Sequence, residues 1–172
     1  MQSDSVRHLL RCSVAAYWRC VLDAEYNRQL YLNVLRYRAF EPLSLERTAA
    51  VIKWTTFVEP TLGKIPEALA RVVKWFGDSS WVETASFDVA TQRLETTYAT
   101  SAMREKTSIR AEVVCEEAPH GACERVQSTL VEVRALGIGG LLEKAILSDM
   151  HRTFDGPAAE FTAEFAKQKG WV

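Results

Sequence analysis

Several features that mark large classes of protein are absent from this sequence. The 21 basic and 22 acidic residues are mixed along the chain and leave a net charge of -1, so nothing in the charge pattern predicts binding to nucleic acid or to an anionic membrane surface. No stretch holds about 18 consecutive apolar residues, and no basic segment leads into an apolar run at the start. We therefore expect a soluble, cytoplasmic protein with no transmembrane segment, and we leave transient membrane contact open.

Cysteine and histidine are both scarce. The four cysteines include no C-x-x-C pair, so we interpret them as reduced thiols in a reducing compartment, although a redox role stays open: Cys12, Cys20, Cys115 and Cys123. Two of them flank His120, but the spacing matches no structural zinc pattern. No Ser-His-Asp or Cys-His arrangement can be assembled from the three histidines. The sequence therefore predicts no metal site, no cofactor and no catalytic residue.

Apolar residues, in contrast, are plentiful and regularly spaced. The chain has 172 residues, of which 48% are hydrophobic, and this is enough for one ordinary core, so we expect a single domain over residues 1–172. Apolar residues recur every three or four positions near the C-terminal end, which predicts a long amphipathic helix over 141–169. Gly156 and Pro157 interrupt the pattern. Because proline lacks an amide donor, we expect a kink near residues 153–157.

The segment before this helix reads Gly-Ile-Gly-Gly at residues 137–140. A glycine-rich segment at a helix start can bind an anion through backbone amides. This one lacks the lysine and serine of a phosphate-binding loop and the spacing of a dinucleotide fingerprint. A turn or packing role is therefore favoured.

Two short helices are expected after a first strand. Alternation predicts a strand over residues 6–12, with Val6, His8 and Leu10 on one side. Ser13 and Asp23 are of the residue types that cap helix N-termini, and apolar residues at helical spacing follow each of them. A V of two short helices is the expected result.

The next segments have a period of two. Residues 36–40 and 50–58 are rich in aromatic and β-branched residues, which predicts a long hairpin with a turn or bulge near Pro42 and Ser44. A short helix is then expected over 66–77, because proline suits the first helical position and glycine follows the end of the pattern.

Four more strands are expected in an antiparallel meander, at residues 80–88, 93–100, 106–117 and 124–135. In the last of them the apolar positions change sides between Leu130 and Val131. A β-bulge near these two residues would explain that change, since a bulge places one extra residue in a strand.

These elements predict an α+β fold. A sheet of about seven antiparallel strands with one apolar face must cover that face, and the helix over 141–169 is the longest element available. We expect the curved sheet to wrap on this C-terminal helix, with two short helices after the first strand and one before the fourth. Such a sheet cannot close tightly along a whole helix, so a cavity between them is expected.

Three segments resemble the START-like, or helix-grip (SRPBCC), superfamily. The opening, with Leu-Leu-Arg-Cys-Ser at 9–13, resembles its first strand and paired short helices. The middle, with Lys-Ile-Pro-Glu-Ala-Leu at 64–69 and Trp-Val-Glu at 81–83, resembles a bacterial lipid-binding-like branch of unassigned function and also PRELI-type phospholipid carriers. Residues 133–143 resemble the passage from last strand to capping helix. The superfamily includes sterol and phospholipid carriers, polyketide cyclases and chaperone activators, so the resemblance implies a fold and a hydrophobic ligand.

The expected cavity would be lined by the inner strand faces and the underside of the helix. The candidate ligand-binding residues are Trp54, Phe57, Trp81, Phe87, Tyr98, Ile109, Val113, Leu130, Met150, Phe154 and Phe161. Arg36, Arg110 or Glu83 could orient a guest if they point inward. Ordinary core packing explains the same aromatic residues equally well, and a shift of one residue would move any strand residue to the other face.

Three functions remain open. The first is a binding or transfer protein for a lipid or other hydrophobic small molecule, which is not an enzyme. The second is an enzyme on the same fold, such as a polyketide cyclase or hydratase that uses inward polar residues as acid or base. The third is a protein-interaction module of the chaperone-activator type. The sequence favours the first, because no catalytic arrangement can be recognised.

Overall fold

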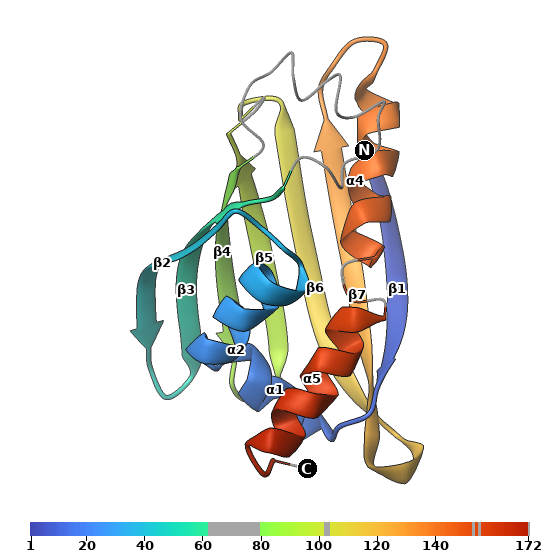
Figure 1. Ribbon diagram of the computed structural model, residues 1–172. Helices are drawn as coiled ribbons and strands as arrows, with labels where there is room; N and C mark the ends of the chain where they lie inside the picture. Colours follow the sequence, from blue (N-terminus) through green and yellow to red (C-terminus); the bar gives the residue numbers. More distant parts are fainter. Residues whose placement is uncertain (62–79, 102–103, 153, 155, 172) are drawn as a thin grey trace.

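Seven segments of two-residue periodicity pair edge to edge into one antiparallel sheet, and helices α1, α2, α4 and α5 all lie on the same face of it (Figure 1). The computed structural model describes residues 1–61, 80–101, 104–152, 154 and 156–171. The elements in chain order are β1 (Gln2–Leu10), α1 (Val14–Val21), α2 (Ala24–Gln29), the π-helix η1 (Leu30–Val34), β2 (Ala39–Arg47), β3 (Val51–Glu59), β4 (Trp81–Asp88), β5 (Arg93–Thr100), β6 (Thr107–Ala118), the 3-10 turn η3 (Pro119–Gly121), β7 (Ala122–Val133), α4 (Gly139–Arg152) and α5 (Pro157–Gln168).

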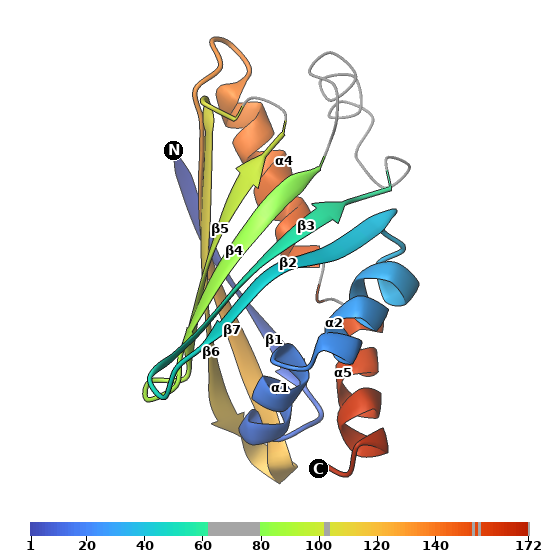
Figure 2. The ribbon, with the colours of Figure 1, turned by 90° about the vertical axis from the view of Figure 1, so that its left-hand side faces the viewer.

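The strand order is β1-β7-β6-β5-β4-β3-β2. Strands β2 to β7 follow one another as a meander, and β1 pairs with β7, so the first and last strands of the chain are neighbours. Figure 2 shows that the sheet is strongly twisted, with β2 and β3 turned away from the direction of β6 and β7. The predicted α+β helix-grip fold, with its curved antiparallel sheet and C-terminal helical cover, is confirmed.

The two short helices begin where their capping residues predict. The Ser13 hydroxyl accepts a hydrogen bond from the Ala16 amide at 3.3 Å, and the Asp23 carboxylate accepts one from the Tyr26 amide at 2.8 Å. Each bond satisfies an amide that has no partner within its own helix. After α2 the chain forms one turn of π-helix, closed by the Leu35 amide on the Leu30 carbonyl at 2.8 Å. Turns of this kind are frequent at functional sites.

Two of the expected strands differ from their predicted bounds by more than two residues. β1 begins at Gln2 and ends at Leu10, before the predicted 6–12 segment is complete. Residues 36–38 are not part of a strand, because the π-helix extends to Val34 and Arg36 adopts a φ of 60°. β2 therefore starts at Ala39, and its register shifts between Pro42 and Ser44, which confirms the bulge expected there. The helix expected over 66–77 lies outside the described residues.

The bulge expected near Leu130 and Val131 is wrong. β7 pairs with β6 and with β1 in unbroken register through both residues. Val126 and Leu130 point outward, whereas Arg125, Gln127 and the other odd-numbered residues of the strand are buried. The apolar residues change sides because the inner face of β7 carries polar side chains, and the backbone itself is regular.

The single kinked helix expected over 141–169 is instead two helices. α4 ends at Arg152, α5 begins at Pro157, and Gly156 between them has a φ of 58°. Glycine adopts this conformation without steric cost, and proline at the first position of α5 gives up an amide that would have no helical partner there. The break allows the two helices to cover different parts of the sheet.

The helical layer packs on the sheet through two apolar clusters. α4 lies on β7 and β1, where Leu142 and Leu147 pack against Val131. α5 lies on α1, β1 and η1, and the larger cluster joins Trp18 of α1 to Phe165 of α5 and to the inner strand faces. The short N-terminal helices therefore cover part of the sheet, whereas the sequence analysis expected the C-terminal helix to cover most of it.

Gly139 is a point of close approach between α4 and the end of β7. A Cβ atom added there would lie 2.4 Å from the Val133 carbonyl oxygen, whereas one added at Gly140 would meet only the Gln2 side chain at 3.9 Å. The Glu143 carboxylate also accepts the Val133 amide at 2.9 Å. The glycine-rich segment therefore serves helix packing, in agreement with its interpretation from the sequence.

Gly139→Ala should lower the free energy of unfolding by about 1–3 kcal/mol, because the methyl group would overlap backbone that cannot move aside easily. Gly140→Ala is the matched control. It should be neutral or stabilise by up to ~1 kcal/mol, because alanine is the better helix former. Urea denaturation of both variants measures the difference, and equal effects at the two positions would contradict the close-approach explanation.

Candidate functional site

A cavity of about 190 Å³ lies between the inner face of the sheet and the layer formed by α1, α2 and η1. Its wall is mostly apolar and includes Leu30, Trp54, Leu94, Val113 and Phe154. The exposed residues of its lining lie on α2 and on β2, so the cavity opens between that helix and the edge strand of the sheet. A concave apolar space with few polar groups is the usual form of a small-molecule site.

Four of the eleven candidate residues line this cavity: Trp54, Tyr98, Val113 and Phe154. The structure brings them together from β3, β5, β6 and the link between α4 and α5. They are separated in sequence by up to a hundred residues, and the fold of the sheet makes them neighbours. Ligand contact by these four stays a prediction.

Five other candidates lie on the inner side but pack in the core. Phe87 is buried against Trp18, with ring centroids 4.8 Å apart. Phe161 stacks on Tyr26 at 5.4 Å. Trp81 meets Tyr37 edge to face at 5.9 Å. The remaining two join the cluster under α4: Ile109 and Met150. None of these five lines the cavity, and ligand contact by them stays a prediction.

Phe57 and Leu130 lie on the outer face of the sheet, so their expected orientation is wrong. Trp54 and Thr56 line the cavity, and because side chains alternate along a strand, Phe57 points the other way. Leu130 is 37% exposed between the buried residues Thr129 and Val131. Both assignments assumed that the apolar residues of a strand face inward.

The inner face of β7 carries a row of buried polar side chains that the sequence analysis missed. Arg125, Gln127 and Thr129 occupy alternate positions and are each at most 4% exposed. Arg125 donates to the side-chain carbonyl oxygen of Gln127 (Oε1), and the side-chain amide nitrogen of Gln127 (Nε2) donates to the Thr129 hydroxyl at 3.0 Å. The signal was present in the sequence, because the apolar residues of this strand change sides where the polar row lies.

Arg125 is held by groups from three further segments. Its Nε donates to the Tyr17 hydroxyl of α1 at 3.0 Å, and Nη1 lies 3.4 Å from His8 Nδ1 on β1. His8 Nε2 lies 3.1 Å from the His151 carbonyl, so a neutral ring protonated on Nε2 satisfies both contacts. The Phe154 ring covers the guanidinium at 3.9 Å from its centroid. Burial raises the pKa of Tyr17 to about 12, against the opposing charge of Arg125.

Of the three residues proposed to orient a guest, only Glu83 points into the cavity. Arg36 is exposed in the turn after η1, and Arg110 is exposed on the outer face. Glu83 accepts a hydrogen bond from the Tyr31 hydroxyl at 3.1 Å. Burial raises the pKa of Glu83 to about 7 despite that hydrogen bond. At neutral pH this carboxyl group is therefore present in both protonation states.

Tyr98 lies between the two polar positions. It is the strand partner of Glu83. Burial, followed by the charge of Glu83, raises the pKa of Tyr98 well above its usual value, while the charge of Arg125 acts in the opposite direction. The cavity thus has a cationic group on β7, a carboxyl group on β4 and a neutral phenol between them.

The cysteines lie outside this polar arrangement. Cys12, Cys20 and Cys123 are buried, and burial raises the pKa of Cys20 to about 12, so this thiol stays protonated. Within the described part of the chain, no group of three or more histidine, cysteine or acidic side chains is arranged to hold a metal ion.

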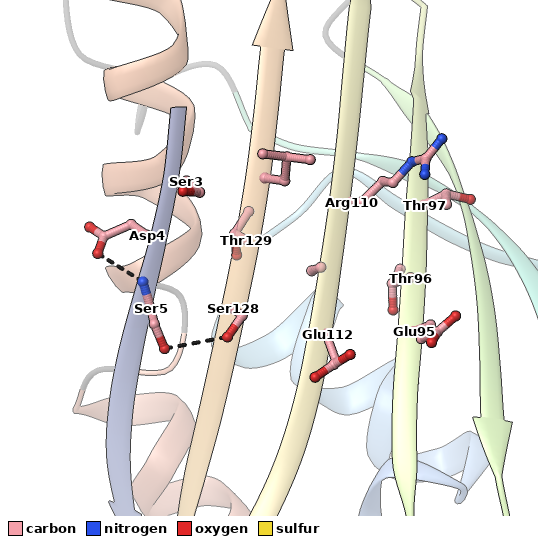
Figure 3. Close-up of a pocket in the computed structure, with 12 residues that line it drawn as sticks. Ser3, Asp4, Ser5, Glu95, Thr96, Thr97, Arg110, Glu112, Ser128 and Thr129 are labelled. Carbon is pink, nitrogen blue, oxygen red and sulfur yellow. Dashed lines mark hydrogen bonds between the residues drawn. The ribbon is translucent and has the colours of Figure 1, made fainter. Parts of the chain in front are cut away.

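A second depression, of about 640 Å³, lies on the outer face of the sheet (Figure 3). It is open, and ten of its twelve lining residues are polar or charged, with Ser5 and Ser128 joined by a hydrogen bond of 3.4 Å. Glu112 at its rim is paired with Arg93 at 2.7 Å. A solvated strand face with hydroxyl and charged side chains explains it, so the inner cavity is the better candidate site.

One protein family matches almost the whole chain. It belongs to the family described as Protein of unknown function (DUF2505), whose model matches residues 5–165. Among curated proteins, no sequence gives a significant match.

Solved structures with the same fold as this DUF2505 protein are numerous. A START superfamily protein from Mycobacterium smegmatis has a TM-score of 0.59 at 9% identity, covering 97% of this chain and 98% of its own. The Zhui aromatase/cyclase from Streptomyces sp. R1128 has a TM-score of 0.65 at 10% sequence identity, and the match covers 98% of this chain and 96% of the cyclase. A norcoclaurine synthase point mutant from Thalictrum flavum, in complex with a transition-state analogue, has a TM-score of 0.66 at 10% sequence identity. The match covers 98% of this chain and 97% of the synthase. The START-like fold is therefore shown, while the resemblance to PRELI-type carriers stays a prediction.

The helices of this DUF2505 protein are short or carry many charged and polar residues. In the part of the chain that the structure describes, none is long and apolar enough to cross a bilayer.

Glu83 should make the stability of the protein depend on pH. The pKa of this carboxyl group is near 4.5 when exposed and about 7 in the folded protein, so between these values the folded state holds a proton that the unfolded state has released. Its contribution to stability is therefore complete below pH 4.5 and is lost as the pH rises through 7. The loss should approach roughly 3 kcal/mol.

Urea denaturation between pH 4.5 and 8 measures this effect when wild type is compared with Glu83→Gln, which cannot titrate at this position. The difference between the two free energies of unfolding should change with pH, because other titrating groups contribute equally to both proteins. Parallel pH profiles would contradict the assignment of a raised pKa to Glu83.

Proposed function

We propose that this protein binds a small hydrophobic molecule in the cavity between the sheet and the short N-terminal helices. The observation that supports it is the cavity itself, which lies between the sheet and the short helices, opens at one side and has a largely apolar wall with polar groups set into it. Burial of apolar surface would supply most of the binding free energy, at ~25 cal/mol per Å². The polar positions, Arg125 on β7 and the Glu83–Tyr31 pair, would fix the orientation of the guest.

The size of the cavity indicates the size of the guest. Its volume of about 190 Å³ is below the roughly 300–1,000 Å³ of most drug-sized sites. This favours a compact molecule of one or two rings, or one with a short alkyl chain, over a phospholipid with two acyl chains. Binding of such a molecule is the function that the cavity supports best.

An enzyme is the second candidate, and Glu83 is the observation that favours it. A carboxyl group with a pKa near 7 can both accept and donate a proton at neutral pH, and the Tyr31 hydroxyl at 3.1 Å holds it in place. Two proteins with this fold are, by their names, an aromatase/cyclase and a synthase. Fold alone does not carry activity between proteins that differ so much in sequence.

The enzyme candidate can be separated from the binding candidate with Glu83→Gln. If the protein is an enzyme, a small-molecule extract incubated with the wild type should lose one component, as measured by mass spectrometry. The same extract incubated with Glu83→Gln should keep that component. If both proteins enrich a component on ultrafiltration and neither consumes any, Glu83 orients a guest and performs no chemistry.

The binding proposal is tested with a neutral bicyclic probe, 2-naphthamide. A molecule of this size in an apolar pocket should bind with a Kd of roughly 10 μM to 1 mM. In methyl NMR spectra of the wild type, the probe should shift Leu94 and Val113, which line the cavity, and leave Leu43 of β2 unchanged. Shifts at Leu43 alone would place the probe on the surface and contradict the proposal.

Thr96→Phe and Thr97→Phe form a matched pair for the same titration. Thr96 is buried in the cavity wall, and its neighbour Thr97 is exposed on the outer face. A ring added at Thr96 should fill the space and weaken binding of 2-naphthamide at least ~10-fold, a loss of about 1.4 kcal/mol. The ring at Thr97 should leave the Kd unchanged. Equal Kd values for the two variants would show that the probe does not occupy the cavity.

A further inference from the structure

Arg125 is a buried cation in the wall of the cavity. Its side chain is 4% exposed and lines the cavity. A guanidinium is always protonated in proteins, and a charge removed from water is costly unless it is paired and hydrogen-bonded. Within the described residues, no carboxylate forms an ion pair with Arg125.

The exposed arginines of the sheet are arranged differently. Three of them face carboxylates on neighbouring or nearby positions, although exposed pairs stabilise a protein little: Arg7–Glu124, Arg93–Glu112 and Arg134–Glu132. Ion pairs therefore form at exposed arginines, where they add little stability. Among the described residues, none forms at the buried Arg125, where a counter-charge would stabilise the protein more. A cation kept in this position at an energetic cost points to a use other than stability.

The groups around Arg125 orient it without neutralising it. They are all uncharged in the tautomer described above: the Tyr17 hydroxyl, His8 Nδ1 and the Gln127 carbonyl oxygen. The Phe154 ring covers one face of the guanidinium. These contacts occupy three of the five N–H groups that an arginine carries, which leaves one on each terminal nitrogen. Two such donors match the two oxygens of a planar carboxylate.

The opposite part of the cavity is suited to the rest of a guest. Glu83 is hydrogen-bonded to Tyr31 and forms no ion pair within the described residues, so it does not serve as the counter-ion of Arg125. Between Arg125 and Glu83 the wall includes apolar side chains such as Trp54, Leu94 and Val113. A molecule with an apolar body and one anionic end would satisfy both regions.

We infer that Arg125 is the anchor for an anionic group, and that the guest of this cavity is a compact hydrophobic molecule carrying a carboxylate. This inference rests on the proposed function, because it assigns the chemical class of the molecule that occupies the same cavity. The carboxylate accepts two hydrogen bonds from Arg125 and supplies the missing counter-charge. The apolar body lies against the wall of β3, β5 and β6.

The test compares two probes of nearly equal shape, 2-naphthoate and neutral 2-naphthamide, by isothermal titration calorimetry at pH 7.5. The wild type should prefer the carboxylate by roughly 10- to 100-fold, the range expected for hydrogen bonds to a charged group. Arg125→Met should abolish this preference while 2-naphthamide still binds. Arg110→Met, which removes an exposed arginine from the outer face, should keep it.

A second measurement needs only the wild-type protein. The guanidinium nitrogen resonances of Arg125, followed by ¹⁵N NMR, should shift when 2-naphthoate is added and move much less with 2-naphthamide. This readout decides the matter if Arg125→Met does not fold.

The outcomes separate this inference from the proposed function. If 2-naphthamide binds in the cavity but the wild type shows no preference for the carboxylate, or if Arg125→Met retains the preference, the inference fails and the proposed function stands. If neither probe enters the cavity of the wild type, both fail.

Discussion

The burial of one guanidinium group is the constraint on which the arrangement of the helical layer depends. Arg125 sits on the inner face of β7 and must be surrounded by groups that replace water. Those groups come from β1, from α1 and from the link between α4 and α5, as His8, Tyr17 and Phe154. Segments from both ends of the chain therefore converge on a single side chain, and the cavity begins where their contacts end.

The same constraint explains why the interior is not packed solid. Apolar side chains alone would interdigitate and fill the space between sheet and helices, as protein cores usually do. Here the polar row of β7 and the carboxyl group of Glu83 line the space from two sides, and neither can be covered by apolar atoms without loss of hydrogen bonds. The cavity combines buried polar groups with an otherwise apolar wall, which distinguishes it from a packing defect.

The fold sets limits on what this cavity can imply. START-like structures with about the same similarity to this chain include proteins named as a cyclase and a synthase, so the helix-grip architecture is compatible with binding and with catalysis. The distinction has to come from the groups inside. An unpaired arginine is suited to holding a charged guest, and a carboxyl group that titrates near neutral pH is suited to moving a proton. The two roles involve different strands and do not exclude one another.

The sequence by itself determined the local elements of this protein. Alternation defined seven strands, and Ser13 and Asp23 placed the starts of two helices, because these signals depend on the backbone and side chains of a few adjacent residues. Glu83 was also recognised as a candidate polar group. Phe57 and Leu130 were placed on the wrong face, because apolar character was used as the guide to orientation. The break at Gly156 was taken for a kink, because the helical spacing of apolar residues continues on both sides of it.

Only the tertiary structure decided which face of β7 is buried and what its polar residues touch. His8 and Arg125 are 117 positions apart in the chain, and Tyr17 and Arg125 are 108 apart. A polar residue within a strand looks solvent-facing until the partners that satisfy it are known, and those partners come from segments that meet only when β1 pairs with β7. The site therefore depends on long-range hydrogen bonds and packing, which leave no local signal beyond the change of sides at Leu130.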